Sequence, residues 1–383
     1  MKSSKLLGIF QGERLKQARQ FAGLSTTELA ERAGVSRQII HSYENPISTK
    51  SPSAETIKSL CSVLGVPESF LMRGLRADES IESAITFRSL QRNRQFERNS
   101  AGAALQLLSS LSAHISEDVE LPPVTLPEFD IPSIELITND FIEEIAIRCR
   151  QEMGLGLGPI PNLTLLLENH GVIIGKWQLA DGMDGLCAWF GSRPHILITT
   201  SAYHARARMD LAHELGHLIL HREVSQEQID DAVQLRLIEK QAKRFASAFL
   251  LPERSFLPEV FTVDFSHLLE MKKRWGVSVA AMIYRLHQLN VISTEKHVRL
   301  QQSLNSQGWK RKEPLDGEIP AENPIFLNRA ADFIAQSGLQ HKAEVFLNSG
   351  LPKDFLLQAA GLIEADLVQQ EIRSNVVQFR RKI

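Results

Sequence analysis

The segment from Asp210 to His221 reads Asp-Leu-Ala-His-Glu-Leu-Gly-His-Leu-Ile-Leu-His, and it constrains this chain more than any other segment. Its residues are mostly apolar and compatible with a helix buried beneath an active site. On such a helix His213 and His217 project from one face, where two imidazole nitrogens can bind a single zinc ion. Glu214 then lies beside the open position of the metal, where a carboxylate can take a proton from water during amide hydrolysis.

A catalytic zinc site needs a third protein ligand, and the next helical segment offers one. Glu239 stands near the start of an amphipathic helix whose apolar residues repeat at helical spacing: Ala242, Phe245, Ala246, Phe249 and Leu250. We interpret Glu239 as the third ligand; an ordinary solvated first-turn glutamate is the alternative. His221 lies one helical turn beyond His217 and either supports the site from behind the ligands or has a structural role.

The segments 208–221 and 239–252 resemble the ImmA/IrrE zinc metallopeptidases, and the resemblance covers about residues 135–260. It implies an intracellular protease that cleaves transcriptional repressors, with zinc bound by His213, His217 and Glu239. The chain departs from the family pattern at Lys243, four residues after the ligand glutamate, where members usually carry Asn or Asp. If that polar group supports a zinc-binding histidine, the lysine weakens metal binding or activity.

The N-terminal residues follow a second pattern, a series of short helices with clear caps. A helix is expected from Gly12 to Gly23, and Ser25 to Glu28 form a capping box that opens the next helix. After a turn at Gly34, Ser36 caps a helix over 37–45, and Ser53 caps another that runs to Leu64. Two short helices joined by a glycine-containing turn are a helix-turn-helix, and the block resembles the DNA-binding domain of XRE-family repressors.

In such domains the start of the second helix reaches base edges in the major groove. Exposed positions there offer base contacts from Arg37, Gln38, His41 and Ser42. Donors at helix starts and loops offer phosphate contacts from Thr26, Asn45 and Lys50. A double-stranded operator is the expected partner, and a helical bundle that binds a protein is the alternative. Since these domains commonly read two half-sites, we also expect a homodimer.

The remaining chain is expected to form further helical units around the peptidase. The apolar block 101–115 predicts a helix that packs on either domain or mediates dimerisation, and prolines at 122, 123, 127 and 132 predict an extended connector after it. The basic helical pair near 265–289 is either a second DNA contact or a structural cover for the peptidase. The expected units are 8–74 (XRE-type domain), 75–134 (helical and proline-rich linker), 135–260 (peptidase), 261–320 (helix-turn-helix-like extension) and 321–383 (helical tail).

Composition indicates in which cellular compartment the protein is expected. No apolar run of 18 or more residues and no N-terminal signal sequence are present, so we expect neither a membrane span nor secretion. The cysteines, Cys61, Cys149 and Cys187, are too far apart for a metal motif and read as reduced packing residues in a cytoplasmic protein. The net charge of −2 gives no global sign of a nucleic-acid partner, so charge has to be read locally.

These patterns predict an α+β multidomain protein: an all-α helix-turn-helix bundle, a zincin-like domain with a small antiparallel sheet, and a helical C-terminal region. The leading hypothesis is a DNA-binding regulator with a zinc-dependent endopeptidase that cleaves a repressor or related regulatory protein. The alternative is a transcription factor whose metal-binding domain is a non-catalytic sensor or dimerisation module.

Overall fold

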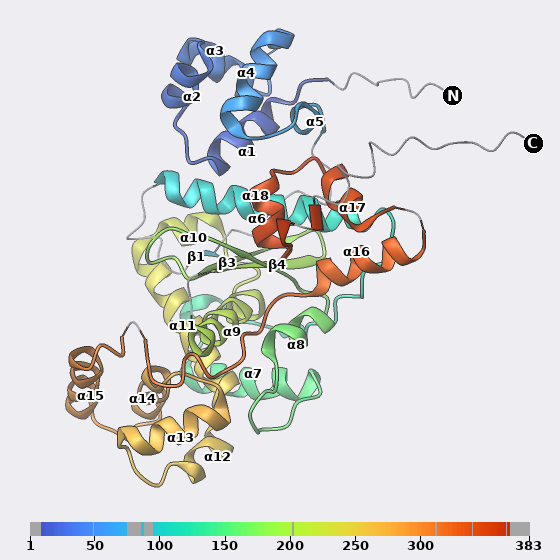
Figure 1. Cartoon of the computed structure of the whole chain (residues 1–383). Helices are drawn as coiled ribbons and strands as arrows, with labels where there is room; N and C mark the ends of the chain where they lie inside the picture. Colours follow the sequence, from blue (N-terminus) through green and yellow to red (C-terminus); the bar gives the residue numbers. More distant parts are fainter. Residues whose placement is uncertain are drawn as a thin grey trace, which may run out of the picture.

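The computed structural model describes residues 9–48, 50–74, 86–87, 95–200, 203–310, 312–338, 340–364 and 366–367. Within them, helices surround a small central sheet, and a separate group of helices forms the N-terminal end of the molecule (Figure 1). The α+β multidomain class expected from the sequence is therefore confirmed.

The N-terminal helices are set by their caps, as the sequence predicts. Ser25 Oγ accepts the Glu28 amide at 3.1 Å, and the Glu28 carboxylate accepts the Ser25 amide at 2.8 Å, which completes the capping box. Gly34 adopts the left-handed conformation (φ 70°) that the turn between the two helices requires. Ser36 and Ser53 cap the next two helices. The helices are α1 (Gly12–Phe21), α2 (Thr26–Ala33), α3 (Arg37–Glu44), α4 (Ala54–Leu64) and α5 (Glu68–Leu71).

The sheet has the order β1-β3-β4-β2, with strands β1 (Thr86–Phe87), β2 (Ile173–Trp177), β3 (Gly185–Phe190) and β4 (Arg193–Thr199). β3 and β4 form an antiparallel hairpin, and β1 pairs antiparallel with β3. The expected antiparallel sheet is wrong at β2, which pairs parallel with β4. The chain reverses twice between β2 and β4, so β4 runs in the direction of β2 and can lie beside it only in parallel.

Two layers of helices enclose the sheet. On one side β3 and β4 contact α9 (His204–Leu220), which packs on α11 (Ala232–Leu250), and α11 in turn packs on α7 (Asn139–Glu152). On the other side the sheet contacts α6 (Gln95–Ile115), whose residues 101–115 are buried apart from the half-buried Gln106. Residues 120–133 form no helix or strand, and the short turn η2 (Ile134–Leu136) follows them before α7.

The remaining helices lie around this core. Below α9 and α11 in Figure 1 are α12 (Glu253–Phe256), η3 (Leu257–Glu259), α13 (Phe265–Trp275), α14 (Val279–Gln288) and α15 (Thr294–Ser306). Near α6 are α16 (Phe326–Gln336), α17 (Lys342–Asn348) and α18 (Lys353–Ala359), while α8 (Leu163–Asn169) precedes β2 and α10 (Gln226–Asp230) precedes α11. Ser278 caps α14, as predicted.

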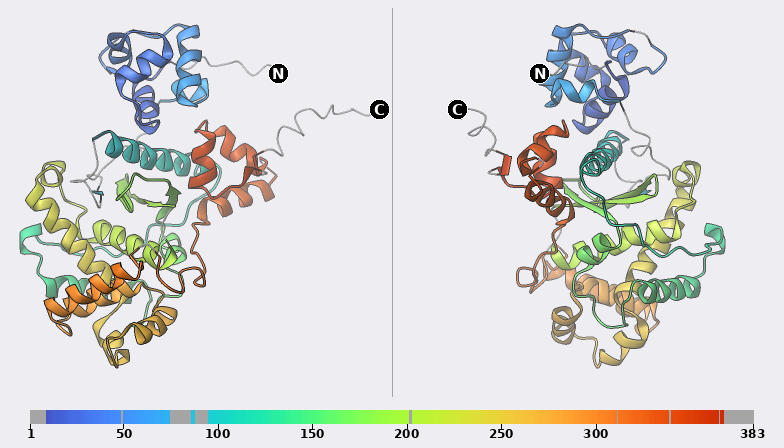
Figure 2. Two further views of the ribbon diagram at one scale, coloured as in Figure 1. Left: turned by 60° about the vertical axis from the view of Figure 1, so that its left-hand side comes forward. Right: turned by 90° about the vertical axis from the view of Figure 1, so that its right-hand side faces the viewer.

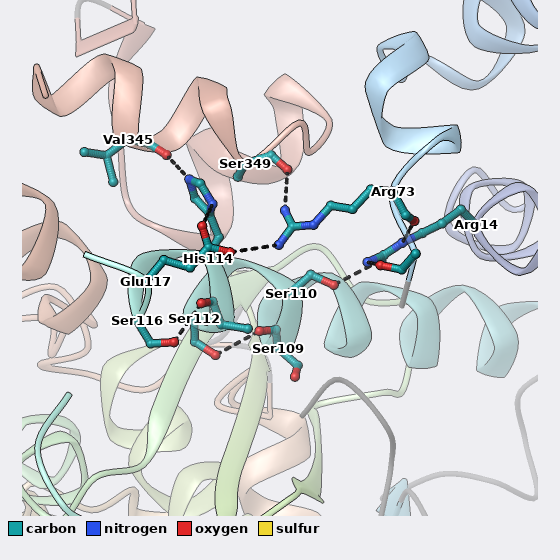
Figure 3. Close-up of polar contacts among 12 residues, drawn as sticks. Arg14, Arg73, Ser109, Ser110, Ser112, His114, Ser116, Glu117, Val345 and Ser349 are labelled. Atoms are coloured by element: carbon teal, nitrogen blue, oxygen red, sulfur yellow. Dashed lines mark hydrogen bonds and ion pairs between the residues drawn. The ribbon is translucent and has the colours of Figure 1, made fainter. Parts of the chain in front are cut away.

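Helix α6 joins the N-terminal helices to the sheet, and both views of Figure 2 show it between them. Arg14 of α1, which is 1% exposed, donates to Ser110 Oγ of α6 at 3.2 Å. Arg73 donates to the Ser349 carbonyl at 3.1 Å, and His114 of α6 contacts the Val345 carbonyl at 3.0 Å (Figure 3). The apolar block 101–115 therefore packs on both the helix-turn-helix region and the sheet.

Two carboxylates link the C-terminal segment to the core, because each accepts hydrogen bonds from the start of a helix that is distant in the sequence. Glu322 accepts the Leu163 and Thr164 amides at the start of α8, at 2.9 and 3.1 Å. In the reverse direction, Glu168 of α8 accepts the Ile325 and Phe326 amides at the start of α16, both at 2.9 Å. Each carboxylate thus satisfies amides that a helix start leaves without an intrahelical partner.

Within the described residues, none of the helices combines the length and the apolar character that a membrane crossing requires.

Candidate metal centre

Helices α9 and α11 bring three of the predicted residues together beneath the sheet. His213 Nε2 and His217 Nε2 lie 3.0 Å apart, because their four-residue spacing places them on one face of α9. Glu239 of α11 approaches both, with 3.2 Å from Oε2 to His213 Nε2 and 3.4 Å from Oε1 to His217 Nε2. Both histidines are buried and Glu239 is partly buried. Among the described residues, these three form a group able to hold a metal ion.

The spacing of these atoms fits zinc. Nitrogen and oxygen ligands bind zinc at about 2.0–2.1 Å in a tetrahedron, so that neighbouring ligand atoms lie roughly 3.3 Å apart. The three separations of 3.0, 3.2 and 3.4 Å agree with that value. Two histidines and one carboxylate are also a known ligand set of catalytic zinc sites, which leave the fourth position open.

The same geometry favours the ionised form of the Glu239 carboxyl group over the protonated form. Burial raises the pKa of this carboxyl group, but the hydrogen bonds and charges of His213 and His217 lower it more, and the net pKa lies well below the ordinary value. Glu239 is therefore ionised at neutral pH, as a metal-binding carboxylate must be.

A chain of hydrogen bonds orients His217. The side-chain amide of Gln241 donates to the Ile134 carbonyl at 2.6 Å, which leaves its Oε1 facing His221 Nε2 at 3.0 Å. Since that oxygen only accepts, His221 carries its proton on Nε2. Burial, followed by the neighbouring His217, lowers the pKa of His221 to about 3, so its neutral ring accepts from His217 Nδ1 at 3.1 Å. In this tautomer Nε2 is the ring nitrogen through which His217 can bind a metal.

Glu214 lies on α9 against the first residue of β3. The side chain is 0% exposed, and a Cβ atom placed on Gly185 would come within 2.9 Å of its Oε1. Cys187 Sγ lies 3.5 Å from the Glu214 carbonyl. A side chain at position 185 would push against the Glu214 carboxylate, so glycine there leaves this carboxylate its room.

A cavity of about 510 Å³ adjoins these helices. Its wall includes Arg206 and Asp210, which precede His213 on α9, and Lys243, one turn after Glu239 on α11. Lys243 Nζ lies 3.9 Å from the ring centroid of Tyr284, a cation–π contact across the cavity wall. Support for His217 comes instead from His221 and Gln241.

The residues predicted to contact DNA lie on and around α3. Arg37, Gln38 and His41 are exposed on that helix. The hydroxyl of Ser42 is half-buried and lies 3.0 Å from Ser48 Oγ, so it faces the following loop rather than solvent alone.

Three further residues were predicted to contact phosphates. Asn45 and Lys50 are exposed in that loop, where Asn45 Oδ1 accepts the Ile47 amide at 3.0 Å, and Thr26 is half-buried at the start of α2. The structure thus gathers this set at one end of the molecule, away from the metal-binding group (Figure 1).

Comparison with known proteins assigns both regions. A helix-turn-helix domain model matches residues 12–75. The SPbeta prophage-derived uncharacterized HTH-type transcriptional regulator YonR of Bacillus subtilis (strain 168) is 34% identical over 74 residues, which are 19% of this chain and 67% of that protein. The chain belongs to the XRE-type helix-turn-helix transcriptional regulators. An IrrE N-terminal-like domain model, of the peptidase M78 family, matches residues 167–287 of this regulator.

The IrrE-like match spans α8 to α14 and includes all three residues of the metal-binding group. The regulator is therefore a DNA-binding protein fused to an IrrE-like domain. Gln241 and Gly185 were missed by the sequence analysis. Gln241 stands two residues after Glu239, and Gly185 follows Asp184 in a turn-like dipeptide. These positions in the sequence do not indicate which side chains the two residues contact in the fold.

Proposed function

We propose that this regulator is a zinc-dependent endopeptidase that cleaves a repressor or another regulatory protein. The observation that carries the proposal is the convergence of His213, His217 and Glu239 at the separations of tetrahedral zinc ligands. The IrrE-like match supports the peptidase class. A zinc ion bound there would polarise a peptide carbonyl and make water a stronger acid.

The side chains of the chain itself supply the rest of the reaction. Glu214 accepts the proton of the attacking water and returns it to the leaving amine, so the peptide C–N bond breaks into a carboxylate and an amine. Its burial against Gly185 holds the carboxylate in one place. Gln241 and His221 keep His217 in the tautomer that presents Nε2 to the metal.

The DNA-binding part follows from α3. In the proposed complex Arg37, Gln38 and His41 read base edges in the major groove of a double-stranded operator, with Ser42 at the margin of that contact. Thr26, Asn45 and Lys50 bind phosphates. Two half-sites would be read by a homodimer. The protein would then act in the cytoplasm, where we expect its operator.

The test separates metal binding from hydrolysis. Glu214→Gln should retain one zinc per chain by native mass spectrometry, because Glu214 is not a ligand, and should lose all hydrolysis. His213→Ala should lose both. Glu223→Gln, an exposed glutamate beyond the same helix, is the matched control and should keep both. Zinc binding without any hydrolysis by the unaltered protein would favour the rival function, a non-catalytic metal sensor.

A further inference from the structure

The sheet has one edge beside the candidate base and one edge remote from it. At the remote edge, β2 contacts α16 and α18, so helices cover it. At the other edge, β3 contacts α9 and begins with Gly185, where an added Cβ atom would lie 2.9 Å from Glu214 Oε1. An extended peptide reaching the Glu214 carboxylate along the described strands would therefore have to lie along the outer edge of β3.

That edge is already occupied by the chain itself. β1 pairs antiparallel with β3, with Thr86 opposite Cys187 and Phe87 opposite Leu186. Leu186 directly follows Gly185, so the pairing ends beside the residue that touches Glu214. β1 belongs to the stretch between the helix-turn-helix match, which ends at residue 75, and α6.

We propose that β1 is an in-cis occupant of the substrate position, so that a protein substrate competes with this segment for the edge of β3. The proposal rests on the proposed peptidase function. Backbone pairing with a sheet edge is how extended peptides are commonly bound, and it depends little on side-chain identity. A segment of the same chain can therefore occupy the site of a substrate.

The length of β1 makes the competition reversible. A strand of two residues contributes few ladder hydrogen bonds, so its pairing alone is weak. Covalent attachment compensates, since a tethered segment acts at an effective concentration on the order of millimolar. A free peptide at micromolar concentration is then excluded until β1 leaves the edge.

The test measures peptide binding without hydrolysis. The probe is a fluorescein-labelled peptide copying residues 81–94 of this chain, and the host is zinc-loaded Glu214→Gln protein, which binds without cutting. Two prolines at Thr86→Pro and Phe87→Pro remove the backbone donors of β1. Fluorescence anisotropy should show the probe binding at least 10-fold more tightly to this variant than to the unaltered host.

The matched control places two prolines in the same connecting stretch but outside β1, at Ala77→Pro and Asp78→Pro, and should leave the affinity of the host unchanged.

Amide exchange gives a second readout: residues 185–190 should exchange faster in the β1 variant and slow again when the probe is added. Equal affinity in the host and the β1 variant, with zinc content and melting temperature preserved, would overturn the proposal. If the unaltered protein cleaves a regulator while these affinities stay equal, the proposal that β1 occupies the substrate position is wrong and the peptidase function stands. If the affinities differ but no protein is hydrolysed, the peptidase function is wrong and the proposal for β1 stands.

Discussion

The amide oxygen of Gln241 accepts a hydrogen bond from His221, and His221 accepts one from His217. Replacing Gln241 with leucine removes both the acceptor for His221 and the donor to the Ile134 carbonyl. The tautomer of His217 is then no longer fixed, and groups of this kind contribute about 10- to 100-fold to metal affinity. We expect Gln241→Leu to weaken zinc binding by that factor in competition with a chromogenic chelator.

Gln226→Leu, an exposed glutamine on α10, is the control and should bind zinc as the unaltered protein does. Unchanged affinity in Gln241→Leu would show that the hydrogen bonds behind His217 do not position it.

The candidate metal ligands could be predicted from the sequence because two of them share one helix. His213 and His217 are related by helical periodicity, which is a local property. The contact of Glu214 with Gly185 and that of Gln241 with Ile134 join elements far apart in the chain. No periodicity encodes such contacts, because they depend on how the elements pack.

At the scale of elements, the turn between α13 and α14 is fitted to helix α9. Gly276 ends α13 with φ 64°, and a Cβ atom there would lie 2.1 Å from Arg208 Nη1. Arg208 cannot simply move aside, since it is 6% exposed and pairs with Glu322 at 3.4 Å. Gly276→Ala should therefore lower the free energy of unfolding by the left-handed backbone cost, about 1 kcal/mol, plus about 2 kcal/mol for the displaced arginine.

Gly34→Ala is a matched control, because Gly34 also ends a helix at φ 70° but has no heavy atom within 4 Å of the point that a Cβ atom would occupy. It should lose only the backbone cost in the same urea titration. Similar losses at the two glycines would contradict a role for Arg208.

The loop after α3 gives a second prediction at this scale. Lys50 is exposed there, and a phosphate contact would release counterions when DNA binds. Lys50→Ala should reduce the slope of log affinity against log salt by about 1, measured on DNA from upstream of the regulator's own gene. Lys296→Ala, on the distant helix α15, should leave the slope unchanged. A slope unaffected by Lys50→Ala would remove Lys50 from the DNA interface.

Helix caps and strand pairing differ in how far the sequence predicts them. The caps at Ser25, Ser36 and Ser53 were predictable because each uses residues within three positions of one another. The parallel pairing of β2 with β4 was not, because it depends on the hairpin of β3 and β4 fitting beside β2. The strand-like runs themselves do not specify their neighbours.

At the scale of the whole molecule, Glu168 links α8 to the C-terminal helices. Burial raises the pKa of this carboxyl group to about 7, although the Phe326 and Ile325 amides oppose the shift. A carboxyl pKa raised on folding means that the folded state holds the proton longer, so stability falls as pH rises from the ordinary value of 4.5 toward 7. Between pH 5 and pH 8 this loss is roughly 2 kcal/mol.

Glu168→Gln keeps an acceptor for both amides but cannot ionise. The variant should therefore gain roughly 2 kcal/mol relative to the unaltered protein between pH 5 and pH 8, by urea unfolding at each pH. A difference that is the same at both pH values would mean that Glu168 is not protonated in the folded protein near neutrality.

The arrangement of the whole chain was the least predictable level. The sequence indicates helices in 101–115 and near the C-terminus but not their partners. In the structure Phe21 of α1, Trp177 of β2 and Phe355 of α18 meet, with ring centroids 5.1 to 5.8 Å apart. Such contacts join residues that lie up to hundreds of positions apart. They form because all apolar faces of the chain are buried together, and the sequence of a single segment does not determine them.

We propose that one chain carries both an operator-binding domain and a working peptidase. To test this proposal, the zinc-loaded protein is incubated with the products of the neighbouring genes, which are then analysed by intact mass spectrometry. We expect fragments of a regulatory protein with the unaltered protein and none with Glu214→Gln, at equal zinc content. Fragments that persist with Glu214→Gln would show that Glu214 is not the base of a peptidase reaction.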